Sequence, residues 1–353
     1  MSTIRDAQSG SSHRSSRLLA RAALPFRGGG SPGAGRREDQ IRIWGPLVAL
    51  IALCVLFSVT SPYFLSLANF QALLDEAAIP LVLATGATFV ILLGSIDLSL
   101  EGITATASCL LALLVRNSQN NLNLGYLGVA VTIAAGMLFG IAAGLLVTRL
   151  RVPSFMATLG LWAVGLGIAA ILFGSRAAVV QDWNVRAMEL TRWLGVPVEV
   201  FMGLVVVALG VFLQRWTRFG RYAIAIGADE RAARTAGIPV DRYKVYVFAF
   251  AAALSALAGV MTAARLGMSD SLAGSGDLFS TLTAVVVGGT LLSGGMGGVL
   301  QSVVGVAIVA VLNNGMVQAG IDPLAQEGIQ GVLIVAAVAL THWPVRERLA
   351  VVK

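Results

Sequence analysis

Long apolar segments recur along almost the whole chain, and they constrain its fold more than any other feature. About ten of these segments approach the roughly 20 residues that an α-helix needs to cross a bilayer. Hydrophobic residues make up 57% of the 353 residues and charged residues only 12%, a composition typical of a polytopic membrane protein. We therefore predict an all-α membrane protein with spans at residues 44–62, 77–95, 100–116, 125–148, 154–173, 197–214, 245–264, 281–293, 298–315 and 326–342.

Positive charge is distributed unequally between the loops that join these spans. With a cytoplasmic N-terminus, twenty of the 25 Lys and Arg residues fall on the cytoplasmic side: eight before residue 44, two at Arg149 and Arg151, seven within 215–244 and three after residue 342. This asymmetry follows the positive-inside rule and predicts that both termini are cytoplasmic. Residues 174–196, which contain Asp182, Trp183, Glu189 and Trp193, then form an outward loop.

Two polar segments flank the predicted membrane domain at residues 44–342. Residues 1–43 carry eight Arg and a GGGSPGAG stretch, and we expect a disordered, solvated cytoplasmic leader because this composition buries little apolar surface. Its apolar patch is interrupted by Arg21 and is too short for a signal-peptide core. Residues 343–353 form a cytoplasmic tail.

The sequence contains no pattern typical of a metal site, a disulfide or a catalytic centre. Cys54 and Cys109 both lie inside apolar runs, where cysteine usually acts as a small buried hydrophobe. His13 and His342 lie far apart, and no cluster has metal-ligand spacing. No H-E-x-x-H or G-x-S-x-G motif is present. We predict no disulfide, no metal site and no catalytic residues, so the chain is expected not to be an enzyme.

A short charged helix is predicted in the cytoplasmic loop, at GADERAARTAGIP. Asp229 can cap its first turn, Glu230 complements the positive helix end, and Arg234 lies toward the negative end. Gly237 can take the left-handed conformation after the helix, and Pro239 prevents continuation. The expected helix is about eight residues long, which is too short to be stable alone in water.

This helix must therefore dock on another surface. On a helical wheel its small residues form one face, with charged residues around it, a pattern that suits a groove on a partner protein. A connector that lies on its own membrane domain is the alternative. The small residues are Ala232, Ala233 and Ala236, and the charged ones are Asp229, Glu230, Arg231 and Arg234.

Four stretches resemble one family of transport proteins. TRFGRYAIAIGADERAARTAGIPVDRYK (Thr217–Lys244) resembles the cytoplasmic loop of the ribose-type permeases, the monosaccharide branch of bacterial ABC importers related to the branched-chain amino acid permeases. GATFVILLGSIDLSLEG (Gly86–Gly102), LRVPSFMATLG (Leu150–Gly160) and the glycine-rich Ala284–Met316 resemble further family segments in the same order. The similarity extends over roughly residues 44–342.

The resemblance implies a permease subunit of the bacterial inner membrane that moves a monosaccharide or small polyol by alternating access. Two permease subunits, expected to form a homodimer, would bind two ATPase subunits, and a periplasmic binding protein would deliver the sugar. The short helix would be the coupling helix that docks on the ATPase. Only Lys244 and Lys353 occur, and neither lies in a phosphate-binding loop, so ATP and Mg²⁺ are expected to be used by the partner ATPase.

A weakly binding sugar path is expected to use hydroxyl, amide and aromatic side chains. The candidates are Phe89, Ser99, Phe155, Thr158, Trp162 and Asn313. Asp97 follows the second span, and we favour capping of the helix that begins near Ser99 over direct sugar contact. Gly136, Gly140 and Gly144 are spaced for close helix packing, and Gly288–Gly298 predicts a tight or broken span near the path.

Other functions remain as alternatives. An ion-coupled secondary transporter would also explain a carboxylate in the membrane. Nucleic-acid binding is not expected, because the Arg residues flank spans on the inner side, where they fix topology and meet anionic lipid.

Overall fold

The computed structural model describes residues 32–322, 325–326, 328–329, 331–332 and 335. Two compact units divide the chain, Met1–Arg42 and Ile43–Lys353. The first 31 residues of the expected leader and the tail at 343–353 lie outside the described residues, as does most of the expected tenth span, 326–342.

Helices form nearly all the regular structure of the described residues, and one two-stranded antiparallel hairpin joins them. The elements are α2 (Pro32–Thr60), α3 (Leu67–Leu92), α4 (Leu100–Leu114), α5 (Tyr126–Thr148), α6 (Ser154–Phe173), α7 (Trp183–Leu190), β1 (Arg192–Trp193), β2 (Val196–Pro197), α8 (Val198–Trp216), α9 (Arg218–Ala228), α10 (Glu230–Thr235), α11 (Val240–Leu266), α12 (Asp277–Val287) and α13 (Val299–Gln318).

Six of these helices, α3, α5, α6, α8, α11 and α13, are long and apolar enough to cross a membrane. Trp44–Thr60, α4 and α12 are shorter apolar helices. The prediction of a mostly helical polytopic membrane protein is therefore confirmed. α2 begins at Pro32, so the last residues of the expected leader belong to this helix.

Two of the expected spans differ from the observed helices. α3 begins at Leu67 rather than near residue 77, because Ser66 caps it and its first turns carry polar residues that a hydropathy pattern omits. α12 covers Asp277–Val287 rather than 281–293, because the glycine-rich segment that follows turns away from the helix.

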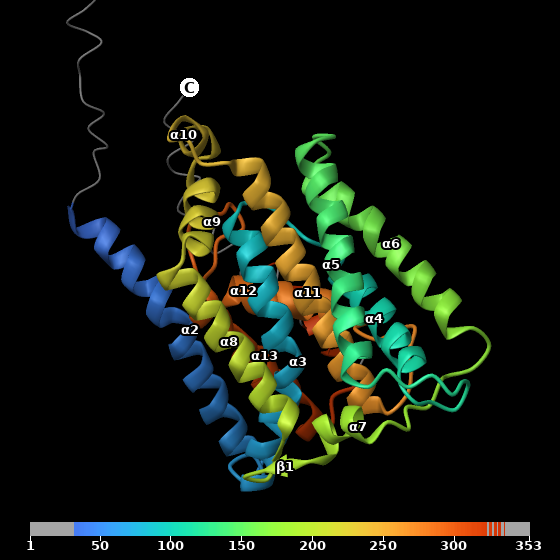
Figure 1. Ribbon diagram of the computed structural model, residues 1–353. Helices are drawn as coiled ribbons and strands as arrows, with labels where there is room; N and C mark the ends of the chain where they lie inside the picture. Colours follow the sequence, from blue (N-terminus) through green and yellow to red (C-terminus); the bar gives the residue numbers. More distant parts are fainter. Residues whose placement is uncertain (1–31, 323–324, 327, 330, 333–334, 336–353) are drawn as a thin grey trace, which may run out of the picture. The chain divides into compact units, whose positions relative to one another are not determined.

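α3 and α11 form the centre of the bundle (Figure 1). Within the most apolar part of each helix, 72% of the residues of α3 and 78% of those of α11 are buried, against 28% for α5 and 22% for α6. α11 packs against α3, α4 and α5, and α3 also packs against α8 and α13. α5 and α6 thus present most of their apolar surface outward, as expected of helices that face lipid.

The glycine repeat of α5 faces α11. A methyl group added at Gly136, Gly140 or Gly144 would overlap Ala256, Phe248 and Val245 respectively, all on α11. The predicted use of this repeat for close packing is confirmed. The two backbones approach so closely that only glycine fits on the α5 side.

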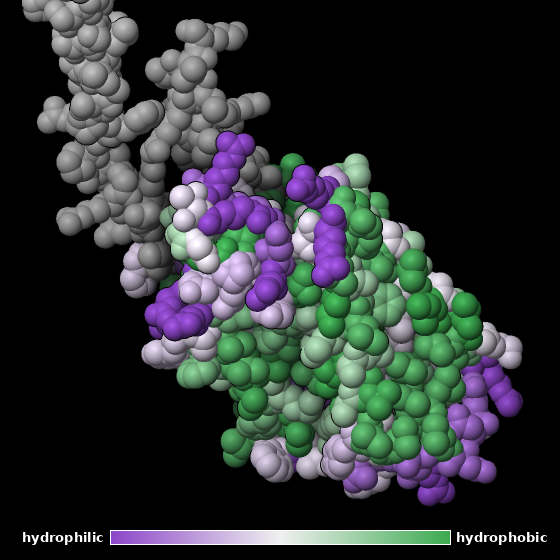
Figure 2. All heavy atoms as spheres, turned by 45° about the horizontal axis from the view of Figure 1, so that its top comes forward, coloured by the Kyte–Doolittle hydropathy of each residue, from purple (hydrophilic) through white to green (hydrophobic). Residues whose placement is uncertain are grey.

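The bundle has two distinct ends. One, the α10 end, carries α9, α10 and the loop at residues 288–298. The other, the α7 end, carries α7, β1 and β2 (Figure 1). Figure 2 shows hydrophilic residues gathered over the α10 end and a broad hydrophobic surface beside them. α11 connects the two ends. It begins soon after α10, and Arg186 of α7 donates a hydrogen bond to the carbonyl of Ala264 in its last turn.

The loop between α12 and α13 is held by left-handed glycines at the α10 end. Gly289, Gly294, Gly295 and Gly297 all have positive φ angles between 75° and 128°. Gly295 N–H donates to Leu92 O at 2.9 Å, which fixes the loop to the last residue of α3. The tight, broken character that the sequence predicts for this segment is confirmed.

We predict that Gly140→Val destabilises the protein by about 1–3 kcal/mol, because the new side chain would overlap the α11 backbone. Thermal unfolding of the purified protein in detergent measures the effect. Gly167→Val on α6 is the matched control, since a β-carbon there meets no atom within 4 Å. Equal unfolding temperatures for the two variants would contradict the close packing of α5 on α11.

Candidate functional site

α10 is a six-residue helix whose start is fixed by Asp229. The Asp229 carboxylate accepts hydrogen bonds from the N–H groups of Arg231 at 2.9 Å and Ala232 at 3.0 Å. These are two of the backbone donors that the first turn of any helix leaves without a partner. The predicted N-cap is confirmed, although the helix is shorter than expected.

The end of α10 is fixed by a Schellman motif. Gly237 has a φ of 79°, its N–H donates to Arg234 O at 3.0 Å, and Ile238 N–H donates to Ala233 O at 3.1 Å. This pair of bonds satisfies the last carbonyls and requires a left-handed residue at the glycine position. The predicted role of Gly237 is thus confirmed.

Ala233 faces the protein itself rather than an outer surface. It is only 5% exposed and lies in a buried cluster with Ala223, Ile226 and Val240. Ala232 and Ala236 are exposed. The single small-residue face predicted from the helical wheel is therefore wrong, because such a wheel does not show which side of a six-residue helix its own domain covers.

Ion pairs tie α10 to the first turns of α11. Arg234 contacts Glu230 at 2.9 Å and Asp241 at 2.5 Å, and Lys244 contacts Glu230 at 2.7 Å. Burial opposes ionisation of Glu230, but hydrogen bonds from Lys244 and Arg234 outweigh it and lower the pKa of this carboxyl below its ordinary 4.5. α10 and α11 are thereby joined as one element.

α9 is fastened to both central helices by aromatic rings. Phe219 on α9 packs against Phe89 of α3 with ring centroids 5.2 Å apart and against Phe250 of α11 at 5.5 Å. Phe89 and Phe250 also contact each other edge to face at 5.4 Å. Offset and edge-to-face arrangements of this kind are the favourable ones for aromatic pairs. A displacement of α9 and α10 would therefore act on α3 and α11 together.

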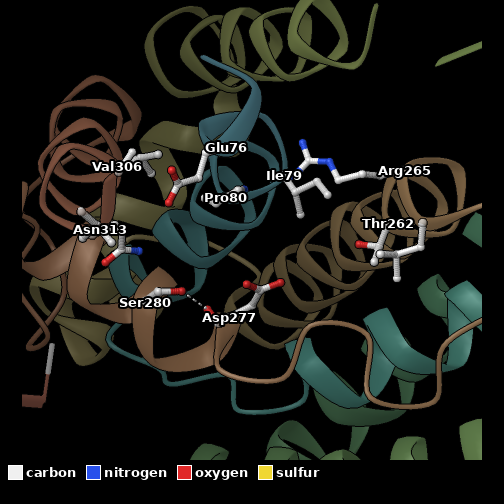
Figure 3. Close-up of a pocket in the computed structure, with 13 residues that line it drawn as sticks. Glu76, Ile79, Pro80, Thr262, Arg265, Asp277, Ser280, Val306 and Asn313 are labelled. Carbon is white, nitrogen blue, oxygen red and sulfur yellow. Dashed lines mark hydrogen bonds between the residues drawn. The ribbon is translucent and has the colours of Figure 1, made fainter. Parts of the chain in front are cut away.

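A cavity of about 280 Å³ lies between α3, α11, α12 and α13, toward the α7 end (Figure 3). At about 30 Å³ per molecule this volume corresponds to roughly nine waters, a size suited to a small solute. Its wall mixes charged, amide, hydroxyl and aliphatic side chains. The lining residues are Glu76, Ile79, Pro80, Thr262, Arg265, Leu266, Asp277, Ser280, Ala284, Val306, Val309, Ala310 and Asn313.

Pro80 lies in this wall and interrupts the hydrogen bonding of α3. Proline has no N–H, so Pro80 inside α3 cannot bond the carbonyl of Glu76 four residues earlier. The Glu76 side chain and Asn313 line the same cavity. The Glu76 side chain is hydrogen-bonded to Asn313, so a carboxylate and an amide lie together in this wall.

Two carboxylates hold Arg265 at the cavity wall. The Nε of Arg265 donates to Glu199 Oε1 at 2.8 Å, and its Nη2 donates to Asp75 Oδ1 at 3.2 Å and to the Asp75 main-chain carbonyl at 2.7 Å. Nη2 also contacts the same Glu199 oxygen. Glu199 is fully buried, so Arg265 neutralises a carboxylate that would otherwise be costly to bury.

The residues predicted for the sugar path do not form one site. Asn313 lines the cavity, whereas Phe89 is fully buried in the aromatic cluster described above, and Phe155 on α6 is 45% exposed. Trp162, which is half-buried, also lies on α6. The sequence identified one cavity residue because Asn313 is polar within an apolar span.

The segment before α4 is a hydrogen-bonded turn. Asp97 Oδ1 accepts from Ser99 N–H at 2.8 Å and from Ser99 Oγ at 2.6 Å, and Thr158 Oγ1 accepts from Leu98 N–H at 3.0 Å. Asp97 thus bonds Ser99, the residue directly before α4, but among the described residues no side chain accepts a hydrogen bond from the first turn of α4, so the favoured capping role is not observed. Thr158 fastens this turn to α6.

Sequence reasoning missed most of the cavity. Glu76, Arg265 and Asp277 are charged residues just outside the expected spans 77–95, 245–264 and 281–293, so the hydropathy pattern did not include them. The adjacent acidic residues Asp75 and Glu76 could have indicated the cavity. Ionisable residues directly before an apolar helical run often mark a buried polar site.

The fold and these sites define a polytopic helical membrane protein with a docked helix at one end and a polar cavity near the other. Residues 69–338 match the family described as branched-chain amino acid transport system / permease component, and the chain belongs to this family.

Several proteins are similar over most of the chain. The probable ABC transporter permease protein YphD of Escherichia coli K12 is 36% identical over 83% of this chain and 87% of its own length. The ribose import permease protein RbsC of the same strain is 33% identical over 84% and 92%. The L-arabinose transport system permease protein AraH is 28% identical over 86% and 92%. No solved structure matches the chain.

We predict that Glu230→Gln loosens α10, because it removes the negative partner of Arg234 and Lys244. Hydrogen exchange of the backbone amides of residues 229–241 should become about two- to fivefold faster, which corresponds to the free energy that an exposed ion pair contributes. The Glu230 pKa is lowered in the folded protein, so its contribution is present above the ordinary value of 4.5 and is lost as the pH falls through the folded value. A difference between variant and wild type that is as large at pH 3 as at pH 7 would contradict this origin.

We predict that Arg265→Leu destabilises the protein by about 3 kcal/mol, since it leaves Glu199 buried without its cation. Adding Glu199→Leu should recover part of the loss in a double-mutant cycle. Arg176→Leu, at an exposed position, serves as the control in the same thermal unfolding experiment. Additive losses for the two single changes would show that the pair does not interact.

Proposed function

We propose that this chain is the membrane-spanning permease subunit of a bacterial ATP-driven importer for a monosaccharide or a small polyol. The family match and the names of the ribose and arabinose permeases support this function. The observation that carries it is α10, a capped helix fixed to α11 by ion pairs and joined through α9 to α3. The chain itself is a transport subunit and not an enzyme.

α10 is the coupling helix in this proposal, and its outer surface docks on a cytoplasmic ATPase that binds ATP and Mg²⁺. Arg231, Ala232, Thr235 and Ala236 are exposed and form this surface. Asp229 and Gly237 fix the helix ends, while Glu230, Ala233 and Arg234 fasten the helix to its own domain. A periplasmic binding protein delivers the sugar, and a second copy of the chain completes a homodimer.

The α10 end lies in the cytoplasm in this arrangement. Arg149 and Arg151 follow α5, whose Gly144 lies against Val245 near the beginning of α11. Their charge therefore gathers with that of residues 215–244 at one end, as expected for the cytoplasmic side of an inner-membrane protein. Both termini are cytoplasmic when the tenth span is counted.

The cavity is the part of the sugar route nearest the periplasm. Its carboxylate, guanidinium and amide groups can exchange hydrogen bonds with hydroxyl groups, while aliphatic residues form the rest of the wall. Asn313 belongs to this route. Alternating access would open the cavity to the other side when the ATPase moves α10, a population shift driven by differential binding of ATP.

We predict that Ala232→Arg reduces co-purification of an ATPase from native membranes at least tenfold, because Ala232 is exposed on the proposed docking surface. The protein should keep its unfolding temperature, since no buried contact is lost. Leu194→Arg, an equal change at a 93% exposed site of the α7 end, is the matched control and should retain the ATPase.

Uptake in cells should fall with the loss of the ATPase. A chain that purifies without an ATPase and transports on an ion gradient after reconstitution would overturn the importer proposal. Normal uptake and normal co-purification for Ala232→Arg would overturn the assignment of α10 alone.

A further inference from the structure

Three carboxylates from separate helices converge at the α7 end. Asp75 lies on α3, Glu189 on α7 and Glu199 on α8, and one oxygen of each lies within 4.8 Å of the others. No sequence spacing indicates this cluster, because more than a hundred residues separate its first and second members. The expectation that the chain lacks a metal site rested on such spacing.

The cluster contains buried oxygens that protein donors do not satisfy. Glu199 is 0% exposed, and its Oε2 has no hydrogen-bond partner among the described residues. Glu189 Oε2 is likewise buried without a partner there. Burial and then the nearby Asp75 carboxylate raise the pKa of Glu189. A buried carboxylate oxygen needs a proton, a hydrogen-bond donor, a cation or a water molecule as its partner, since the free-energy cost of its desolvation is otherwise uncompensated.

The basic residues around the cluster do not balance it. Arg265 contacts Glu199 Oε1 and Asp75 Oδ1, but not the Oε2 atoms of Glu189 and Glu199. Arg192 acts on Glu189 electrostatically, but its Nη1 donates to Gly195 O at 3.3 Å. Arg186 is bonded to the carbonyls at the end of α11. Among the described residues, Arg265 is thus the only cationic side chain paired with this cluster, and it contacts two of the three carboxylates.

We propose that Asp75, Glu189 and Glu199 bind a divalent cation of the Ca²⁺ type. All three ligands are oxygen donors, which hard cations prefer. Ca²⁺ tolerates irregular coordination that water molecules complete. Mg²⁺ requires a near-ideal octahedron, and ligands from three separate helices meet that requirement less easily. The bound cation would link α7 and α8 to α3, beside the guanidinium that lines the cavity.

Terbium luminescence tests this site directly on the full-length protein purified in detergent. Tb³⁺ occupies Ca²⁺ sites, and Trp183 and Trp193 flank Glu189 in the sequence and can sensitise its emission. We expect saturable emission that Ca²⁺ displaces and that Mg²⁺ displaces at least tenfold less well. Ca²⁺ should also raise the unfolding temperature, because it binds only the folded site.

Glu189→Gln is the decisive variant, since it removes one ligand and leaves the pair of Arg265 and Glu199 intact. It should weaken Tb³⁺ and Ca²⁺ binding at least tenfold and remove the Ca²⁺-dependent thermal shift. Asp270→Asn, an acidic residue of the same end outside the cluster, should change neither. Glu199→Gln should repeat the loss of binding if it folds.

Equal affinity in wild type and Glu189→Gln would overturn the site and assign any emission to adventitious binding. Absence of saturable emission and of a Ca²⁺ effect in wild type would overturn it too, and would leave the carboxylates to share protons. These measurements need no partner subunit, so their outcome is independent of the importer proposal.

Discussion

The close approach of α11 to its neighbours is the contact on which the rest of the bundle depends. Glycines lie at this contact on several sides: Gly140 of α5 faces Phe248, Gly86 of α3 lies against Ala251, and Gly259 of α11 lies against Thr104 of α4. Lipid tails are as apolar as the side chains, so the hydrophobic effect contributes little to association of helices in a bilayer, and dispersion between closely packed backbones must supply it. Larger residues at these positions would separate the helices and lose that attraction.

This packing turns α11 into a rigid connection between the two ends of the bundle. Its 27 residues correspond to about 40 Å of continuous helix. Asp241 in its first turn pairs with Arg234 of α10, and Arg265 in its last turn lines the cavity. A force on α10 therefore reaches the cavity through one helix, while the aromatic contact of Phe219 carries the same displacement to α3.

The sequence predicted features that depend on neighbouring residues and missed those that depend on distant ones. The cap at Asp229, the left-handed Gly237 and the packing face of α5 all follow from a few adjacent residues, and each is observed. The inward orientation of Ala233 was missed, because it depends on how α9 and α11 cover a helix of six residues. The cavity was missed for the same reason, since its wall combines four helices whose arrangement no local pattern encodes.

The described cavity wall offers hydrogen-bonding groups but no aromatic face, which bears on how it would hold the solute of the proposed route. The sequence led us to expect aromatic faces along the route, yet no aromatic side chain is found among the described residues that line the cavity. A sugar held there would exchange hydrogen bonds to water for hydrogen bonds to Glu76, Arg265 and Asn313, each contributing about 1 kcal/mol net with the amide and about 1.5–3 kcal/mol with a charged group. Stacking on a ring would add binding energy that must be recovered before release. A route that must both accept and release its solute works better without that addition, because conduction requires binding weak enough to leave.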